Sequence, residues 1–312
     1  MTDHISTPDA VATSWVHRAP GRLQPMLQMM RADRPIGAWL LAIPCFWGLA
    51  LAGVETGPSV QLILYGALMA IGAYVMRSAG CVYNDIVDQD IDAQIARTAA
   101  RPLPSGRMST RDAWLLLAGL LVIGLVVLLQ FNRLTIFVGA SALGLVAAYP
   151  FMKRITWWPQ AWLGLTFNWG ALVGYSAVTG QLSASAITLY IAGIFWTLGY
   201  DTIYAHQDRE DDALVGVKST ARRLGEGSPI WVRGFYGVTI FLFAVAGVMT
   251  SASLMYFLAL APVAWRFWNQ TQSLDIKDDH NCLSRFKMNQ TNGILLAAAL
   301  GMDIIFTQFW VA

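Results

Sequence analysis

The sequence predicts an all-α, polytopic membrane protein with about nine transmembrane helices around a central cavity. Of its 312 residues, 56% are hydrophobic and only 13% are charged, whereas about a quarter of the residues in a soluble domain are charged. The mean hydropathy is positive. Apolar runs of spanning length and a one-sided distribution of Lys and Arg lead to the same prediction.

Nine apolar runs are each about as long as a helix that crosses a bilayer, about 17 to 25 residues. They lie at about 36–54, 59–83, 113–131, 134–150, 161–179, 186–206, 231–250, 252–269 and 291–311. We expect each run to form one transmembrane helix.

The basic residues predict the orientation, because Lys and Arg concentrate in cytoplasmic loops. With nine spans and a cytoplasmic N-terminus, all 21 Lys and Arg residues except Arg77 and Arg133 lie on the cytoplasmic side. The prediction is therefore N-in and C-out. Residues 1–30 have no apolar core of a signal peptide and are expected to be a cytoplasmic tail, while residues 31–312 are expected to form a single nine-helix domain.

Charge and cysteine usage exclude other classes of protein. The net charge of +2 indicates no nucleic-acid partner, because topology already accounts for the basic residues. Cys45 and Cys81 fall within or at the ends of spans, and Cys282 falls in a predicted cytoplasmic loop. This spacing predicts neither a disulfide framework nor a metal-thiolate site.

Two acidic clusters follow the second and sixth predicted spans. The first contains five acids and amides, Asn84, Asp85, Asp88, Asp90 and Asp92, and the second is the stretch Y-D-T-I-Y-A-H-Q-D-R-E-D-D over 200–212. The pair Asp88 and Asp92 recurs 120 residues later as Asp208 and Asp212. We interpret the recurrence as a diverged internal repeat.

Helical spacing adds deeper polar residues to each cluster, because residues three, four and seven apart share a helix face. In the first cluster, Asn84, Asp88 and Asp92 share one face, and Arg77 lies on the same face two turns deeper. In the second cluster, Asp208 and Asp212 share one face with Asp201 and Tyr204. Solvated helix ends account for acids such as Glu210 and Asp211. They do not account for matching carboxylate pairs with ionisable groups two turns deeper in apolar spans.

Oxygen donors without His or Cys suit Mg²⁺, which typically bridges one or two carboxylates to phosphate oxygens. We therefore expect two aspartate-rich rims that face each other across a pocket and hold Mg²⁺ and a diphosphate. The expected metal ligands are Asn84, Asp88, Asp92, Asp208 and Asp212.

Basic residues accompany both acidic clusters. R-T-A-A-R-P-L-P-S-G-R follows the first, K-S-T-A-R-R-L-G follows the second, and Y-P-F-M-K-R closes the fourth span. None of these stretches is a Walker loop. Each residue alone is also explained as a topology determinant, but together they supply the cations that a bound polyanion requires.

These motifs carry a family resemblance. N-D-x-x-D-x-x-x-D over 84–92, followed by R-T-x-x-R-P-L-P-S-G over 97–106, resembles the first motif of the UbiA superfamily of intramembrane aromatic prenyltransferases. Y-D-T-x-Y-A-x-x-D-x-x-D-D over 200–212, followed by G-V-K-S-T-A-R-R-L-G, is similar to the 4-hydroxybenzoate polyprenyltransferase branch. The resemblance runs from about Arg31 to the last span. Asp90 is an additional carboxylate in the first motif, and Asp303, deep in the ninth span, has no assigned role.

The resemblance implies Mg²⁺-dependent transfer of a polyprenyl group from polyprenyl diphosphate to 4-hydroxybenzoate, at the ring carbon ortho to the hydroxyl, in ubiquinone biosynthesis. Mg²⁺ and basic side chains would neutralise the leaving diphosphate. Asp201 and Arg77 are the expected catalytic residues, with Asp201 accepting the ring proton. Substrate-binding roles are expected for Arg34, Arg77, Arg97, Arg101, Lys153, Arg154, Asp201, Tyr204 and Lys218.

The isoprenoid tail gives this reaction a reason to occur in a lipid bilayer, because the tail can extend between helices into lipid. We expect a bacterial inner membrane, with the site on its cytoplasmic side. Trp39, Trp47, Trp169 and Trp196 are candidates to stabilise an allylic cation through their ring faces. Interfacial anchoring or core packing is the alternative for each of them.

Two alternative functions fit parts of the pattern. An ion-coupled secondary transporter would also have intramembrane carboxylates and a diverged repeat, but its acids would be expected at the midplane. Within the superfamily, another acceptor such as homogentisate, dihydroxynaphthoate or haem is the alternative. Magnesium-dependent diphosphate release separates the enzyme from the transporter, and competition between acceptors separates the branches.

Overall fold

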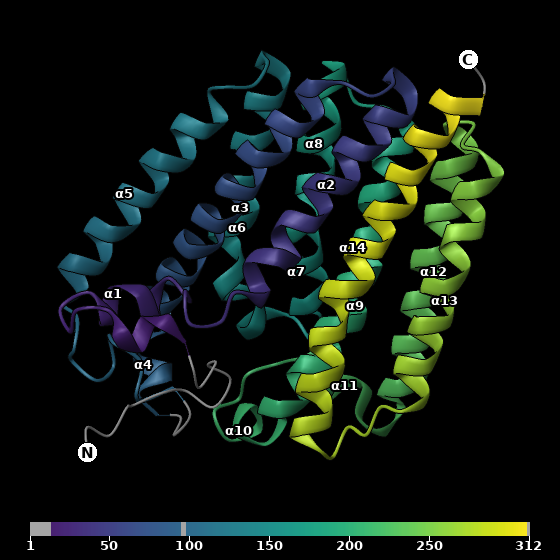
Figure 1. Ribbon diagram of the computed structural model, residues 1–312. Helices are drawn as coiled ribbons and strands as arrows, with labels where there is room; N and C mark the ends of the chain where they lie inside the picture. The colour runs from purple at the N-terminus through teal and green to yellow at the C-terminus, as the bar shows by residue number, and fades with distance from the viewer. Residues whose placement is uncertain (1–13, 95–97, 311–312) are drawn as a thin grey trace. The chain divides into compact units, whose positions relative to one another are not determined.

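The computed structural model describes residues 14–94 and 98–310, and over these residues it contains helices and no strand. The predicted all-α fold is therefore confirmed. The chain, whose helices are labelled in Figure 1, divides into two compact units. Unit 1 comprises Met1–Trp39 and Ile71–Leu129, and unit 2 comprises Leu40–Ala70 and Gln130–Ala312. The division into a tail and one nine-helix domain stays a prediction.

The long helices coincide with predicted spans. They are α2 (Ile36–Thr56), α3 (Val60–Val87), α5 (Thr110–Leu128), α6 (Arg133–Ile155), α9 (Ala184–Ala205), α12 (Ser228–Met249), α13 (Leu254–Gln272) and α14 (Asp279–Trp310). The short ones are η1 (Trp15–Arg18), α1 (Gln24–Met29), α4 (Gln89–Asp92), η2 (His206–Asp208), α10 (Arg209–Leu214), α11 (Thr220–Leu224) and η3 (Gly225–Gly227).

Six helical stretches of the described chain are long and apolar enough to cross a membrane. Soluble domains do not contain so many apolar stretches of spanning length, so the chain is an integral membrane protein. The count of nine spans and the N-in, C-out orientation stay predictions.

The fifth predicted span is two helices, α7 (Pro159–Phe167) and α8 (Trp169–Thr179), separated at Asn168. Asn168 is fully buried, and its Nδ2 donates to Gly164 O and to Thr197 Oγ1, both at 2.8 Å. A Cβ atom at Gly193 of α9 would lie 2.2 Å from Asn168 Oδ1, so only glycine admits this approach. The break is therefore set by a tertiary contact with α9, which the apolar run alone does not reveal.

Helix α9 is the central element of unit 2 and packs against α7, α8, α12 and α14. Its Trp196 lies against Trp47 of α2 with ring centroids 4.8 Å apart, and Phe243 of α12 meets Trp47 edge-on at 4.9 Å. The indole Nε1 of Trp47 donates to Gly293 O at 2.8 Å. These aromatic contacts form the core of unit 2, because all three rings are fully buried.

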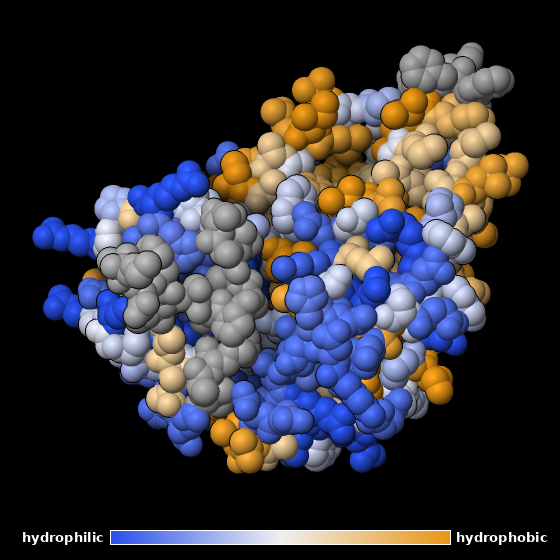
Figure 2. All heavy atoms as spheres, turned by 60° about the horizontal axis from the view of Figure 1, so that its bottom comes forward, coloured by the Kyte–Doolittle hydropathy of each residue, from blue (hydrophilic) through white to orange (hydrophobic). Residues whose placement is uncertain are grey.

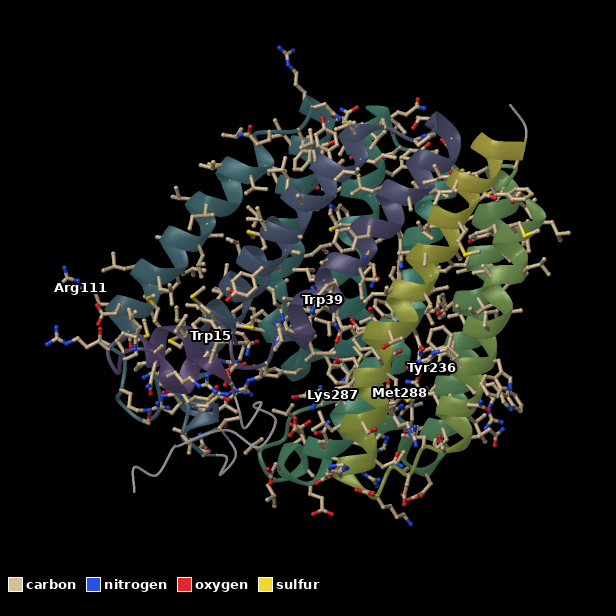
Figure 3. The ribbon with its side chains drawn as sticks, viewed as in Figure 1. Trp15, Trp39, Arg111, Tyr236, Lys287 and Met288 are labelled. Carbon is tan, nitrogen blue, oxygen red and sulfur yellow. The ribbon has the colours of Figure 1, made fainter. Side chains whose placement is uncertain are left out.

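A buried hydrogen-bond network joins α12, α13 and α14 beside this core. Tyr236 of α12, labelled in Figure 3, donates to Asn289 Oδ1 of α14 at 3.0 Å, and Gln270 Nε2 of α13 donates to Tyr236 Oη at 3.1 Å. Asn292 Nδ2 then donates to Gln270 Oε1 at 2.9 Å. Such groups are stable in an apolar interior only when their partners are present, so the network fixes the register of the three helices.

Unit 1 has its own apolar core around the C-terminal half of α3. Its buried members are Met29, Val75, Ala79, Val82, Leu103, Ala113, Leu117 and Leu120. The N-terminal segment supplies the first, α3 supplies three, the loop after α4 supplies Leu103, and α5 supplies the rest. This core fixes both the N-terminal segment and the basic motif loop against the end of α3.

In unit 2, hydrophilic side chains gather at the end of the molecule that carries α10 and α11 (Figure 2). Exposed or half-exposed charged residues there include Arg209, Glu210, Asp211, Arg222 and Arg223. The second acidic cluster thus belongs to a polar end of unit 2, as the sequence predicts, while the helices that precede it are apolar.

The role of Asp303, left open by the sequence, is evident from its partner. Asp303 is fully buried in α14, and its Oδ1 accepts a 2.8 Å hydrogen bond from the backbone N–H of Ser253, the N-cap residue of α13. A carboxylate at this position satisfies a backbone donor at the helix start and complements the positive end of the helix dipole. Asp303 is a structural cap supplied by a neighbouring helix.

Replacing Asp303 with Ala is expected to lower stability by about 0.5 to 2 kcal/mol, the usual cost of a lost N-cap acceptor. Asp303→Asn keeps one acceptor oxygen and should lose less. The midpoint of thermal unfolding in detergent measures both losses, and turnover per folded molecule should stay at the wild-type level. A stable Asp303→Ala protein without turnover would instead make Asp303 part of the active site.

Candidate active site at two aspartate-bearing helix breaks

Both acidic clusters lie where a long apolar helix stops. Helix α3 ends at Val87, and Asp88 then precedes α4 with φ −98° and ψ 7°. Helix α9 ends at Ala205, and Asp208, the last residue of the 3₁₀ turn η2, precedes α10 with φ −107° and ψ 3°. The two aspartates thus occupy the same backbone position in their two segments, which supports the interpretation of an internal repeat. In neither case does the carboxylate make the capping hydrogen bond common for Asp at this position.

The helical turn continues through the first break. Asp88 N–H donates to Asn84 O at 2.9 Å, and Asp92 N–H donates to Asp88 O at 2.8 Å. The three predicted ligands of the first cluster therefore keep the i, i+4 spacing of one face. In the second cluster, the 3₁₀ turn η2 follows α9 and ends at Asp208. The continuous α-helical face expected there is interrupted, because a 3₁₀ turn is wound more tightly than an α-helix.

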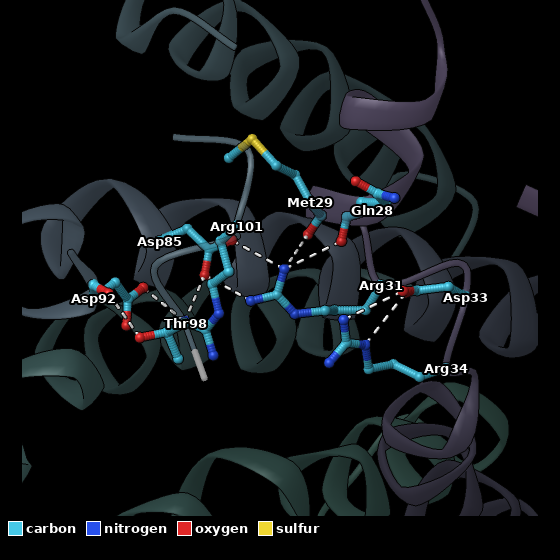
Figure 4. A network of polar contacts seen from close by, with 9 residues as sticks. All are labelled: Gln28, Met29, Arg31, Asp33, Arg34, Asp85, Asp92, Thr98 and Arg101. Atoms are coloured by element: carbon cyan, nitrogen blue, oxygen red, sulfur yellow. Dashed lines mark hydrogen bonds and ion pairs between the residues drawn. The ribbon is translucent and has the colours of Figure 1, made fainter. Parts of the chain in front are cut away.

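Three carboxylates of the first cluster are buried, and arginines pair with Asp85 and Asp92 (Figure 4). Asp88, Asp85 and Asp92 are 0%, 1% and 4% exposed. Arg31 donates to both oxygens of Asp85, at 2.6 and 2.9 Å, and Arg101 Nη1 donates to Asp92 Oδ2 at 2.6 Å and to Asp85 Oδ1 at 3.3 Å. Burial raises the pKa of the Asp92 carboxyl, and the ion pair with Arg101 opposes that shift.

The basic motif after this cluster folds into turns that position Arg101. Thr98 Oγ1 donates to Asp92 O at 2.8 Å, Arg101 N–H donates to Thr98 O at 2.9 Å, and Ser105 Oγ donates to Arg101 O at 2.6 Å. Gly106 closes the loop with φ +71°, a conformation that favours glycine. The R-P-L-P-S-G sequence is therefore a scaffold for one guanidinium. Arg97, also predicted to bind substrate, lies outside the described residues.

Two further predicted residues of unit 1 have defined surroundings. Arg34 donates from Nε and Nη2 to the two oxygens of Asp33, both at 3.2 Å, just before α2. Arg77 of α3 lies against Gly37 in the first turn of α2, where a Cβ atom would come 2.5 Å from its Nε. Gly37 therefore leaves the space that the Arg77 side chain fills.

In unit 2, Asp201 and Tyr204 lie on the more exposed face at the end of α9. Both are half-buried, whereas Thr202 and Ile203 between them are buried. The Tyr204 ring lies 4.6 Å from the ring of Phe286 on α14. A carboxylate and an aromatic surface therefore share this face, which is the combination expected around a phenolic acceptor.

The second basic motif is attached to the end of α6. Lys218 N–H donates to Lys153 O at 2.9 Å, and Lys218 Nζ donates to Ile155 O at 3.1 Å, so Lys218 satisfies C-terminal carbonyls of α6. Arg154 is exposed at the same helix end. The structure thus brings Lys153 and Lys218 together, while contacts of these three residues with substrate stay predictions.

The four tryptophans differ in environment. Trp47 and Trp196 are fully buried against each other, so core packing describes their contacts. Trp169 Nε1 donates to Val138 O at 2.8 Å. Trp39, labelled near the start of α2 in Figure 3, is 41% exposed and keeps the part of its surface that interfacial anchoring uses.

The donor chemistry of the two breaks fits a hard divalent cation. Among the described residues, no three His, Cys, Asp or Glu side chains gather closely enough to enclose an ion by themselves. Mg²⁺ often binds through one or two carboxylates and completes its shell with water and phosphate oxygens. Asp88 and Asp92 at the first break, and Asp208 and Asp212 at the second, each carry oxygen donors of the kind that Mg²⁺ binds.

Sequence comparison identifies relatives of this chain. Residues 41–293 match the model of the UbiA prenyltransferase family. The mitochondrial 4-hydroxybenzoate polyprenyltransferase of Caenorhabditis elegans is 46% identical over 93% of this chain and 81% of its own length. The human protein of the same name is 45% identical over 96% of this chain and 79% of its own. The chain spans only 64% of the Aedes aegypti relative, at 45% identity.

Solved structures have the same fold. A UbiA homolog from Aeropyrum pernix superposes with a TM-score of 0.67 at 24% identity, covering 87% of this chain and 98% of the homolog. A homolog from Archaeoglobus fulgidus, described as bound to GPP and Mg²⁺, gives 0.65 at 19% identity over 90% and 99% of the two chains. With its helical fold, its two aspartate-bearing helix breaks and a family match over most of its length, this chain belongs to the UbiA prenyltransferase family.

Proposed function

We propose that this protein transfers a polyprenyl group from polyprenyl diphosphate to the ring carbon ortho to the hydroxyl of 4-hydroxybenzoate, in ubiquinone biosynthesis. The identity of 45 to 46% with relatives named for this reaction, over 91 to 96% of the chain, is the observation that carries the proposal. The carboxylates and arginines at the two helix breaks supply the chemistry that the reaction needs.

The reaction begins when the allylic C–O bond breaks and the diphosphate leaves with the electron pair. Bound Mg²⁺ supplies positive charge that offsets the charge growing on the leaving group. Asp88 and Asp208 are proposed to hold the cation, together with Asn84, Asp92 and Asp212. Arg101, fixed by its motif loop, adds N–H donors to the diphosphate oxygens. A homolog described as bound to GPP and Mg²⁺ supports this choice of donor and cation.

The acceptor then attacks the allylic carbon through the ring carbon beside its hydroxyl group. That carbon loses its proton, which restores the aromatic ring. Asp201 is proposed to hold the hydroxyl and accept the proton, because it is a half-buried carboxylate on the same face as Tyr204. The ring pair of Tyr204 and Phe286 offers an apolar surface for the acceptor. Arg77 is proposed to bind the acceptor carboxylate or the diphosphate.

The membrane that holds the protein is a separate part of the proposal. The apolar helices and the family support an integral membrane protein with lipid around its spans. The relatives are named as mitochondrial proteins, so their names do not support the predicted bacterial inner membrane, which stays a prediction together with the cytoplasmic side of the site.

The proposed reaction is tested with purified protein, Mg²⁺, one prenyl diphosphate and a panel of acceptors. We expect prenylated 4-hydroxybenzoate as the main product by mass, with one diphosphate released per product. Homogentisate, dihydroxynaphthoate and haem serve as competing acceptors. Preferred prenylation of one of them would contradict the assignment of 4-hydroxybenzoate as the acceptor. Absence of diphosphate release would contradict the proposed prenyltransferase activity.

The equivalent aspartates at the two breaks give the first prediction for the site. Asp88→Ala and Asp208→Ala should each abolish turnover, because each removes an oxygen ligand of the cation from a different segment. Turnover of the wild type should also disappear with EDTA and return with Mg²⁺. Asp211→Ala, which removes a neighbouring carboxylate of α10, is the matched control and should be mild. Near-normal turnover of either Asp88→Ala or Asp208→Ala at equal expression would refute the two-segment metal site.

A specific role of Arg77 in turnover can be distinguished from a general effect of losing one basic charge. Arg77→Ala should lower the rate at least tenfold, about 1.4 kcal/mol of transition-state stabilisation. Arg133→Ala, which removes an exposed arginine at the start of α6, should leave the rate unchanged. Steady-state rates normalised to folded protein decide the comparison. Equal rates for wild type and Arg77→Ala would leave Arg77 a structural role only.

Asp201→Asn tests whether Asp201 acts on the aromatic acceptor and not on the prenyl diphosphate donor. The substitution keeps the shape of the side chain but removes its charge and basicity. Transfer to 4-hydroxybenzoate should fall by about 10² to 10⁴, as for loss of a general base, while binding of prenyl diphosphate and its Mg²⁺ dependence persist. Product mass and equilibrium binding measure the two effects separately. Loss of prenyl diphosphate binding would show instead that Asp201 is a metal ligand or a structural residue.

A further inference from the structure

The second residue of the first motif, Asp85, has a role that its sequence position does not reveal. It is 1% exposed near the end of α3 and belongs to unit 1, as do both of its charged partners. Its Oδ1 accepts from Arg31 Nη2 at 2.6 Å and from Arg101 Nη1 at 3.3 Å, and its Oδ2 accepts from Arg31 Nη1 at 2.9 Å (Figure 4). Both carboxylate oxygens are therefore used by guanidinium groups.

Arg31 is held in place by more than this ion pair. Its backbone has φ +57°, which is unusual for a residue other than glycine and persists only when the surroundings fix it. Its Nη1 also donates to Gln28 O at 3.1 Å and to Met29 O at 3.4 Å, at the end of α1. Ser78 of α3, two turns before Asp85, donates to Met30 O at 3.2 Å. The N-terminal segment is thus attached to α3 at two points.

Arg101 connects this anchor to the proposed diphosphate site. Its Nη1 lies between Asp85 and Asp92, so one nitrogen pairs with a structural carboxylate and with a predicted metal ligand. A guanidinium has five N–H groups in a fixed plane. Because the group is planar, holding one nitrogen in place sets the direction of the remaining N–H bonds. That direction determines whether these N–H groups can donate to a diphosphate oxygen.

We infer that Asp85 is a positioning residue: together with Arg31 it fixes the Arg101 guanidinium in the orientation that receives the diphosphate, and it does not bind the metal. Three observations support the inference: both oxygens of Asp85 are occupied, the two partners converge from segments on either side of it in sequence, and Arg101 reaches Asp92 from the same contact. The inference rests on the proposed function, because it assigns Arg101 to the diphosphate.

The test measures binding of inorganic diphosphate by calorimetry at saturating Mg²⁺, which requires neither acceptor nor turnover. Asp85→Asn should weaken the affinity at least tenfold, because the amide cannot pair with two guanidinium groups. Arg101→Ala should weaken it as much or more. The double variant should be at most twofold weaker than Arg101→Ala alone, because Asp85 acts through Arg101.

Asp90→Asn is the matched control. It makes the same chemical change five residues later, at an exposed position of α4, and should bind diphosphate as the wild type does. In turnover assays, Asp85→Asn should raise the KM for prenyl diphosphate and leave the KM for 4-hydroxybenzoate unchanged. A purely structural role would not produce this selectivity.

Three results would overturn the inference. Additive losses in the double variant would show that Asp85 does not act through Arg101. Recovery of diphosphate affinity at Mg²⁺ concentrations above those that saturate the wild type would make Asp85 a metal ligand. Unchanged diphosphate affinity in a folded Asp85→Asn protein would leave it without a positioning role. A wild type that binds diphosphate but prenylates no 4-hydroxybenzoate would contradict the proposed function alone.

A second variant covers the case in which Asp85→Asn does not fold, since it leaves two arginines beside a neutral amide. Asp85→Asn combined with Arg31→Gln removes one negative and one positive charge together. Thermal unfolding in detergent confirms that the protein is folded before binding is measured. The same weakening of diphosphate binding is expected, and wild-type affinity in this folded variant would also overturn the inference.

Discussion

A carboxylate removed from water at the end of an apolar helix must be neutralised, and the architecture of the site depends on this constraint. In unit 1 two arginines neutralise Asp85 and Asp92. Arg31, which precedes them in sequence, pairs with Asp85. Arg101, which follows them, pairs with both aspartates. The contacts determine more than local charge balance. They hold the N-terminal segment, the end of α3 and the R-P-L-P-S-G loop together. The same three segments also contribute residues to the apolar core of unit 1.

A similar helix break with an aspartate occurs in the second half of the chain. Asp88 and Asp208 stand at equivalent breaks with nearly equal dihedral angles. A break that ends an apolar helix and starts a short acidic one places a carboxylate at the polar end of the helix, where diphosphate can be reached from water while the isoprenoid tail remains in lipid. The basic loops after each break differ, since Arg101 pairs with carboxylates and Lys218 with the carbonyls of α6.

The sequence predicted the features that depend on local pattern. Apolar runs located the long helices, because length and hydropathy decide which segments can span a bilayer. Features set by distant partners were missed. The break at Asn168 depends on Thr197 in α9, and the role of Asp303 depends on the helix start at Ser253.

The candidate site divides along the same line. The i, i+4 pairs of aspartates were recognisable from spacing alone. Helical spacing assumes an unbroken helix, however, so it did not predict the 3₁₀ turn that ends at Asp208. Nor could it predict that Arg31, 54 residues before Asp85, would be its partner. The partners of a buried carboxylate, such as the two arginines at Asp85, are visible only in the folded chain.

The most direct test of the account is a structure of the protein with a non-cleavable prenyl thiodiphosphate and Mn²⁺, which can be located by its anomalous scattering. The account predicts cations within coordination distance of Asp88 and Asp208, about 2.0 to 2.3 Å as for Mg²⁺ and its close substitutes, with the diphosphate between them and Asp85 still paired with Arg31. Cations bound by Asp85, or a diphosphate that contacts neither break, would contradict it.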